Sequence, residues 1–372
     1  MVTINLASRS LETIAEVWQV DETRSKWSDE GFEWWPGDFR VSVMAQSDAR
    51  QQEPETWRLV IKTDFLKEVP VHDKRFSGLA PTFSRFMTST YAWAYPTSEI
   101  WKEWGSSETT PKMWFASCAY VNAENVSWMP DFLAKMAIMQ PINAQLQAHM
   151  ATELFAGGLP DASRPENLAD AGLADVLEVA TQAYVPIGQE ASRWIGKSEF
   201  SEFAEKYAQN DNCFGFGDEN SLSAETPFGS DTALIRLVTD QRHPQLGSGL
   251  LATLLLPFFG EDSEIANECA GLNFLEATSW TGFPLFGSWH PHAAREGKQG
   301  PSFTTFVPNA LYQPVLATNF ALWMLGRARW VRQTRWPDVE DKRMGEILEG
   351  RFGRKSSIDL HGLAGRGSGQ GG

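Results

Sequence analysis

The stretch Asn125-Val126-Ser127-Trp128-Met129-Pro130 returns later in the chain as Asn309-Ala310-Leu311-Tyr312-Gln313-Pro314, and each copy stands directly before a long apolar segment. A second pair, Trp57-Arg58-Leu59-Val60 and Ile235-Arg236-Leu237-Val238, occurs in the same order. The two members of the second pair are 178 residues apart (57 to 235), and those of the first pair are 184 residues apart (125 to 309). Two diverged copies have such similar separations when the later copy is slightly longer. Internal similarity in a fixed order indicates a repeated structural unit. The alternative is a coincidence between short apolar strings.

The length of the chain agrees with two copies of one module. A chain of 372 residues can form two units that each bury a core of their own. We expect a first module at residues 1–155, a linker with a bridging helix at 156–197 and a second module at 198–336. Residues 337–372 then form a short helix and a glycine-rich flexible tail.

Hydrophobic spacing predicts the same series of helices and strands in both modules. In the first we expect a helix at 11–20, antiparallel strands at 32–45 and 57–65, a helix at 76–95, a strand at 113–121 that Val126 and Trp128 continue, and a helix at 130–155. In the second we expect a helix at 200–208, strands at 214–225 and 233–239, a helix at 263–280, strands at 285–290 and 302–307, and a helix at 314–331. We interpret residues 246–249 as a loop before a helix.

This order predicts an α+β fold. It consists of two tandem α-β-β-α-β-β-α sandwich modules with antiparallel sheets, related by a pseudo-twofold axis, with one further strand expected in each.

The order of elements resembles the type III secretion chaperone-like fold, in particular the YbjN-like bacterial sensory-transduction and chaperone-like proteins. The resemblance covers residues 11–155 and 200–331, and it depends most on 125–137 and 308–321, where a strand pair leads into an apolar helix. It implies a binding protein without catalytic residues. The chain departs from the family in its many tryptophans and in its long loops at residues 46–55 and 96–110.

Composition argues against several classes of protein. The formal charge of −15 and the pI near 4.9 disfavour nucleic-acid binding, which needs Lys and Arg to neutralise phosphates. Three scattered cysteines make neither a disulfide framework nor a zinc ribbon, which suggests a reducing compartment. The start of the chain lacks the pattern of a secretory signal, and the longest apolar stretch, residues 246–259, is too short to cross a bilayer. We therefore expect a cytoplasmic protein without a membrane segment.

Known catalytic and ligand-binding patterns are weak or absent. His290-Pro291-His292 would place two imidazoles on one face of a strand, but two ligands do not make a metal site, and Pro291 is typical of a strand end or edge. Gly247-Ser248-Gly249 misses the spacing of a nucleophile elbow, and the glycine pattern of residues 367–372 has no strand before it and no helix after it. The sequence therefore predicts no catalytic residue, no metal and no cofactor.

Tryptophan is the unusual residue of this chain, with 16 copies. We predict partner binding by four tryptophans that form two pairs at the ends of predicted elements. The pairs are Trp34 with Trp35, and Trp101 with Trp104. Because adjacent residues of a strand face opposite ways, only one of Trp34 and Trp35 is expected in the core. The other would lie on a surface patch or in the seam between modules. Three roles stay open for the tryptophans: core or seam packing, an external protein partner, or stacking on a sugar or nucleotide.

The sequence thus favours a non-catalytic, chaperone-like or adaptor protein that binds another protein and is either a monomeric pseudo-dimer or a homodimer. Neutralising a toxin or a phage component would have the same physical basis. The alternative is a hydrolase or metal-dependent enzyme with a site between the modules that uses His243, His290 or His292.

Overall fold

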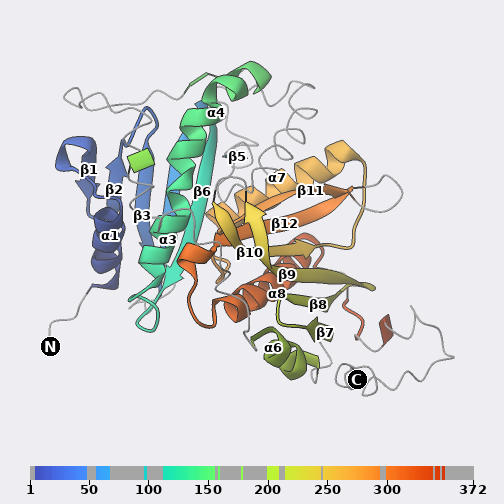
Figure 1. Cartoon of the computed structure of the whole chain (residues 1–372). Coiled ribbons are helices and arrows are strands. Elements are labelled where there is room, and N and C mark those ends of the chain that lie inside the picture. Colours follow the sequence, from blue (N-terminus) through green and yellow to red (C-terminus); the bar gives the residue numbers. More distant parts are fainter. Residues whose placement is uncertain are drawn as a thin grey trace.

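Each half of the chain forms its own six-stranded antiparallel sheet, and the two sheets have the same strand order. The first is β1-β2-β3-β4-β6-β5, and the second, read from its own first strand, is β7-β8-β9-β10-β12-β11. In both, four strands follow one another as a meander, the sixth strand pairs with the fourth, and the fifth strand forms the edge. Figure 1 shows the two sheets side by side. The expected α+β fold with two modules is confirmed.

The computed structural model describes residues 5–47, 56–67, 96–98, 112–155, 158–159, 177–178, 199–208, 214–243, 246–293, 299–337, 340–343 and 346–347. The first half contains α1 (Leu6–Val17), η1 (Glu22–Arg24), β1 (Ser25–Ser28), β2 (Gly31–Trp34), β3 (Val41–Ser47), β4 (Trp57–Lys67), β5 (Pro96–Ser98), β6 (Lys112–Val121), α3 (Met129–Ala137) and α4 (Met139–Phe155). The second half contains α6 (Glu199–Ala208), β7 (Phe214–Gly217), β8 (Ser221–Phe228), β9 (Asp231–His243), β10 (Gly247–Leu255), α7 (Asp262–Thr278), β11 (Ser288–Ala293), β12 (Gln299–Pro308), η4 (Asn309–Leu311) and α8 (Leu316–Arg335).

Strand alternation decides which face of each sheet is covered. In β3, Val41, Val43 and Ala45 are buried on one face, over which α1, α3 and α4 pack. In β10, Leu250, Ala252 and Leu254 are buried in the same way, and α8 covers that face of the second sheet. Each sheet thus buries one face beneath its own closing helix.

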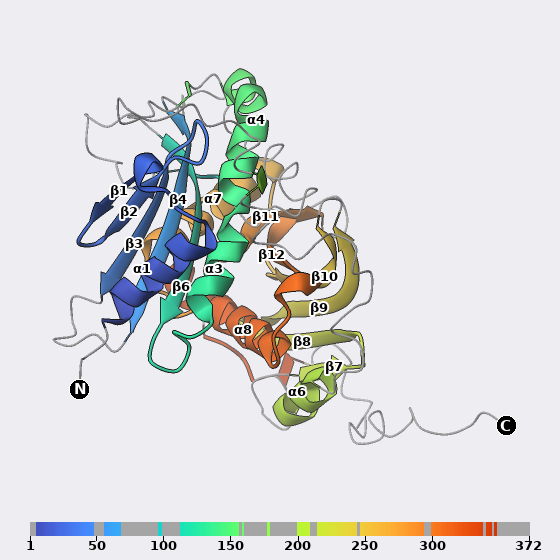
Figure 2. The ribbon, with the colours of Figure 1, turned by 60° about the vertical axis from the view of Figure 1, so that its left-hand side comes forward.

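Helix α7 belongs to the second half of the chain but packs against both sheets. It contacts β11 and β12 of its own sheet and also β5 and β6 of the first. In Figure 2, α7 lies between the first sheet and the strands β11 and β12. The outer face of the first sheet is therefore covered, at β5 and β6, by an element of the other module.

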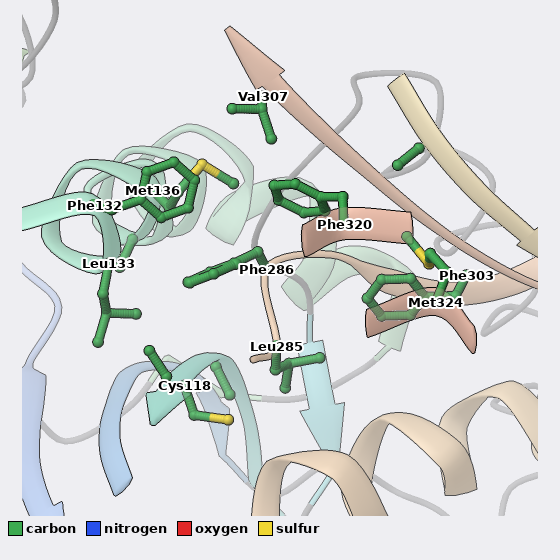
Figure 3. Close-up of a cluster of buried hydrophobic side chains, with 14 of the residues drawn as sticks. Cys118, Phe132, Leu133, Met136, Leu285, Phe286, Phe303, Val307, Phe320 and Met324 are labelled. Carbon is green, nitrogen blue, oxygen red and sulfur yellow. The ribbon is translucent and has the colours of Figure 1, made fainter. Parts of the chain in front are cut away.

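The two modules share one hydrophobic core. Figure 3 shows Phe286 between side chains of α3 and α8, and its ring lies 5.1 Å from that of Phe132, edge to face. Phe286 is also 6.2 Å from the ring of Trp323 in α8. Cys118 of β6 and Leu285 exchange two backbone hydrogen bonds, 3.2 and 2.9 Å long. Buried residues of both halves consequently form a single cluster.

One of the two sequence repeats marks equivalent places and the other does not. Asn125 and Asn309 both follow the sixth strand of their sheet and precede its closing helix. Trp57-Arg58-Leu59-Val60, however, lies on the fourth strand, β4, whereas Ile235-Arg236-Leu237-Val238 lies on the third, β9. The prediction that this motif is a shared landmark is wrong. Both strands are central in their sheets, and central strands carry similar apolar patterns.

Several element boundaries differ from the prediction for local reasons. Val126 and Trp128 do not extend the sheet but form a turn before α3. The predicted helix at 130–155 divides at Ile138, because Pro141 has no N–H to donate to the carbonyl of Ala137. The predicted strand at 214–225 is the hairpin of β7 and β8.

The interpretation of residues 246–249 as a loop before a helix is also wrong, because β10 begins at Gly247. This glycine has a φ of +73°, which allows the sharp turn out of β9.

Other expectations fall on residues outside the described ranges: the helix at 76–95, most of the linker at 156–197 and nearly all of the tail. Among the helices that the structure describes, none has the length and apolar character needed to cross a bilayer.

Candidate functional site

The predicted partner-binding pair Trp34 and Trp35 is buried. Trp34 is 3% exposed and stacks on Trp18 at 5.1 Å, and Trp18 in turn donates its indole N–H to the carbonyl of Ala134. Trp35 is 1% exposed. Neither side chain lies on an exposed surface, so the prediction of a surface patch is wrong, and a place in the seam between the modules stays a prediction for Trp35. The predicted residues Trp101 and Trp104 lie outside the described residues.

The strand alternation fails for this pair because β2 ends at Trp34. Trp35 follows the strand, donates its backbone N–H to the carbonyl of Arg24 and precedes Pro36, where the chain turns. Its side chain is buried apart from the main core cluster. Two adjacent tryptophans are thus both buried, and only Trp34 belongs to the main core cluster.

The histidines of the enzyme alternative do not converge. His290 is 5% exposed and is held between Thr304, at 2.9 Å from Nε2, and the carbonyl of Pro291, at 3.2 Å from Nδ1. Burial lowers its pKa to about 4, so it is neutral at physiological pH. His292 is exposed at the end of the same edge strand, and the ring of His243 lies 5.0 Å from that of Phe306, tilted by 36°. Within the described residues no three His, Cys, Asp or Glu side chains are grouped so as to hold a metal ion.

Exposed aromatic side chains occur instead on two of the edge strands, β1 and β7. Trp27 of β1 is 48% exposed, and Phe216 of β7 is 65% exposed. In the described part of the chain β1 pairs only with β2, and β7 only with β8, so each strand is an edge of its sheet. An edge strand can accept a further strand from another chain.

The sequence Phe214-Gly215-Phe216-Gly217 explains why β7 exposes aromatic rings. Gly217 lies against α6, where a Cβ would overlap the carbonyl oxygen of Phe200. The glycines therefore occupy the face beneath the helix, and the two phenylalanines point to the other face. This alternation of aromatic residue and glycine is a sequence signal for an exposed edge, and the prediction of one continuous strand at 214–225 missed it.

The junction between the modules is polar at its centre. Arg58 of β4 is 3% exposed and donates from Nη2 to the carbonyls of Glu276 and Ala277, at 3.1 and 2.7 Å, near the C-terminus of α7. Beside it, the hydroxyl of Tyr120 accepts a hydrogen bond of 2.7 Å from the backbone N–H of Thr281. Burial, followed by the nearby thiol of Cys118, raises the pKa of Tyr120. These contacts fix the end of α7 on the first sheet.

A buried ion pair fixes the same helix to α8. Arg327 contacts Glu276 at 2.9 Å, and each side chain is at most 2% exposed. The indole N–H of Trp289 donates to the same carboxylate at 2.6 Å, and the guanidinium lies 3.7 Å from the centre of the Phe303 ring. The charges of this cluster are balanced within the protein, which indicates a structural role.

A cavity of about 600 Å³ opens at the junction, next to Arg58. Its walls come from both modules: the start of α1, the β1–β2 turn, the facing ends of β3 and β4, and the chain after α7. The lining residues are Asn5, Ala7, Ser8, Asp29, Glu30, Ala45, Gln46, Ser47, Trp57, Arg58, Thr278 and Trp280. The cavity thus combines a buried cation, two exposed carboxylates and two half-buried tryptophans.

Neither protein-family models, nor curated proteins, nor solved structures gave a match to this chain. The geometry therefore carries the functional argument alone. It offers two sheet edges that carry exposed aromatic side chains and one polar cavity. The hydrogen-bonded pair of His290 and Thr304 does not line that cavity.

Proposed function

We propose that this chain is a non-catalytic, cytoplasmic protein-binding protein of the chaperone-like or adaptor type, related in architecture to the YbjN-like proteins. The observation that carries the proposal is the pair of edge strands β1 and β7, each with a large aromatic side chain in solvent. A partner in extended conformation would add a strand to one of these edges. Its main chain would supply the hydrogen bonds, and its side chains would pack on Trp27 or Phe216.

The aromatic residues fit this role better than a core role. Tryptophan and phenylalanine bury large areas with few rotatable bonds, and such residues dominate the binding energy of protein interfaces. Natural edge strands usually carry charges or proline against unwanted pairing. The exposed aromatic residues of β7 depart from that pattern, as expected for an edge that is covered in a complex.

The test is affinity capture from the native host with the variants Trp27→Ala and Phe216→Ala. Truncation at the edge that the partner occupies should weaken partner capture about thirtyfold or more, since a hot spot contributes roughly 2 kcal/mol or more. Leu322→Ala is the matched control, because Leu322 is a 39% exposed apolar residue on the helix α8 and not on an edge strand. Mass spectrometry of the captured proteins and thermal melts of each variant complete the measurement.

Two results would contradict the proposal. One is a partner that both edge variants retain at the level of the control. The other is a stoichiometric transition metal in the purified protein whose loss abolishes a catalytic activity, which would favour the hydrolase or metal-dependent enzyme.

A further inference from the structure

The cavity at the module junction contains a buried cation with no carboxylate partner among the described residues. Arg58 donates to Gln46 Oε1 at 3.0 Å and to the carbonyls of Glu276 and Ala277, and all three acceptors are uncharged. Its Nε is buried and has no hydrogen-bond partner in the part of the chain that the structure describes. A helix C-terminus supplies only about half a negative charge. Because an uncompensated buried charge is costly, the cavity favours an anionic group beside Arg58.

The N-terminus of α1 is a second feature of the cavity that attracts negative charge. Asn5, Ala7 and Ser8 of its first turn are among the lining residues, although α1 packs on the face of β3 and β4 opposite to Arg58. Gln46, the side-chain acceptor of Arg58, is exposed at the end of β3, so an incoming carboxylate can replace it. A carboxylate or a phosphate would give Arg58 Nε the acceptor that it lacks among the described residues.

The opposite end of the cavity selects against a simple anion. Asp29 and Glu30 in the β1–β2 turn are exposed carboxylates that attract a positive group. The carbonyl of Glu30 accepts from the N–H of Ala45 on β3, and Gln46 of β3 lies opposite Arg58 on β4. The turn is therefore two strand spacings from Arg58, roughly 10 Å at the backbone.

The ligand that fits this charge pattern has a carboxylate at one end and a cation roughly 10 Å away, with apolar groups between them to pack on Trp57 and Trp280. We infer that the cavity binds the C-terminus of a protein partner, with its terminal carboxylate at Arg58 and a basic side chain two residues upstream at Asp29 and Glu30. Two residue rises of about 3.3 Å plus the reach of a lysine side chain span a distance of this order. The net charge of −15 also favours a basic partner segment.

This inference rests on the proposed protein-binding function and adds a second contact with the partner. The probes are fluorescein-labelled pentapeptide pools, randomised except for lysine at the third position from the C-terminus, and titrated against the full chain by fluorescence anisotropy. We expect the free-carboxylate pool to bind. The same pool with a C-terminal amide should bind about tenfold more weakly or worse, since hydrogen bonds to charged groups are the strong ones.

Variants assign the two ends of the site. Arg58→Lys keeps the charge but loses the planar donor set, and should weaken binding about tenfold. Asp29→Lys combined with Glu30→Lys should reverse the preference, so that a pool with glutamate in place of lysine binds more tightly. These two residues are exposed, so we expect the variant to fold like the unaltered protein. Glu12→Lys combined with Glu16→Lys makes the same charge change on the exposed side of α1 and should leave the preference unchanged.

Equal binding of the acid and amide pools would overturn the inference, and so would the absence of binding by every pool. In either case a partner whose capture still depends on Trp27 or Phe216 would leave the proposed function standing. The converse outcome is that the peptides bind only with a free C-terminal carboxylate, while partner capture is unchanged by Trp27→Ala and Phe216→Ala. This would support peptide binding in the cavity and overturn the edge-strand proposal.

Discussion

At the scale of single residues, Trp34 and Trp35 show how burial can differ from strand alternation. We predict that Trp34→Ala and Trp35→Ala each lower the free energy of unfolding by about 3 to 5 kcal/mol, because each empties a large buried aromatic site. Urea titration at a fixed temperature measures this. Trp27→Ala, which truncates an exposed ring, is the control and should cost far less. A small effect at Trp35 would mean that its surroundings are not packed as the structure has them.

His290 should make stability depend on pH. Its pKa is about 4 in the folded protein, below the ordinary value of 6.5, because burial disfavours the charged ring. Between these values the unfolded chain binds a proton that the folded chain does not, so stability falls as the pH drops from 6.5 toward 4, and the loss levels off below about 4.

We predict that His290→Asn removes this contribution, whose slope is at most about 1.4 kcal/mol per pH unit. Unfolding free energies of both proteins at several pH values between about 4 and 8 give the difference, in which the contributions of the carboxylates cancel. Parallel curves for the two proteins would contradict the assignment.

At the scale of elements, the contact of α6 with β7 depends on glycine. We predict that Gly217→Ala lowers stability by about 1 to 3 kcal/mol and speeds amide exchange in α6, because the added Cβ meets the carbonyl of Phe200 and the helix must move. Gly215→Ala is the matched control. Its Cβ would lie 3.5 Å from the Cα of Ala204, an ordinary contact, so we expect little change. Equal effects of the two substitutions would show that a general property of the strand, and not this contact, is responsible.

The sequence predicted most long elements but not their partners. The periodic segments that became α6, α7, α8 and β6 were identified with small boundary errors, since their apolar spacing is regular. The hairpin of β7 and β8 and the strand β10 were missed, because glycines that permit turns and close packing look like loop residues in sequence. The candidate site was hidden for another reason. Arg58 and Glu276 are 218 residues apart, and no local pattern predicts that they meet.

At the scale of the whole molecule, the shared core predicts cooperative unfolding. Phe286 packs against Phe132 of the first module and Trp323 of its own, and Arg58 holds the end of α7. We predict a single unfolding transition in urea, with coincident curves from far-ultraviolet circular dichroism and tryptophan fluorescence. Phe286→Ala should shift that one transition by about 3 to 5 kcal/mol without splitting it. Two separate transitions in the unaltered protein would show that the modules are independent.

The backbone bridge between Cys118 and Leu285 joins segments that the ribosome makes at different times. These residues are 167 positions apart (118 to 285), and α7, which covers the outer face of β5 and β6, is made only shortly before Leu285. At about 5 to 20 residues per second, roughly 8 to 33 seconds pass between the emergence of β6 and that of its cover. During this interval β6, with Trp114, Cys118 and Tyr120, lacks the helix that packs on it in the folded protein. The first module is therefore synthesised before the helix that covers one face of its sheet. That face is covered only after α7, in the last third of the chain, has been made.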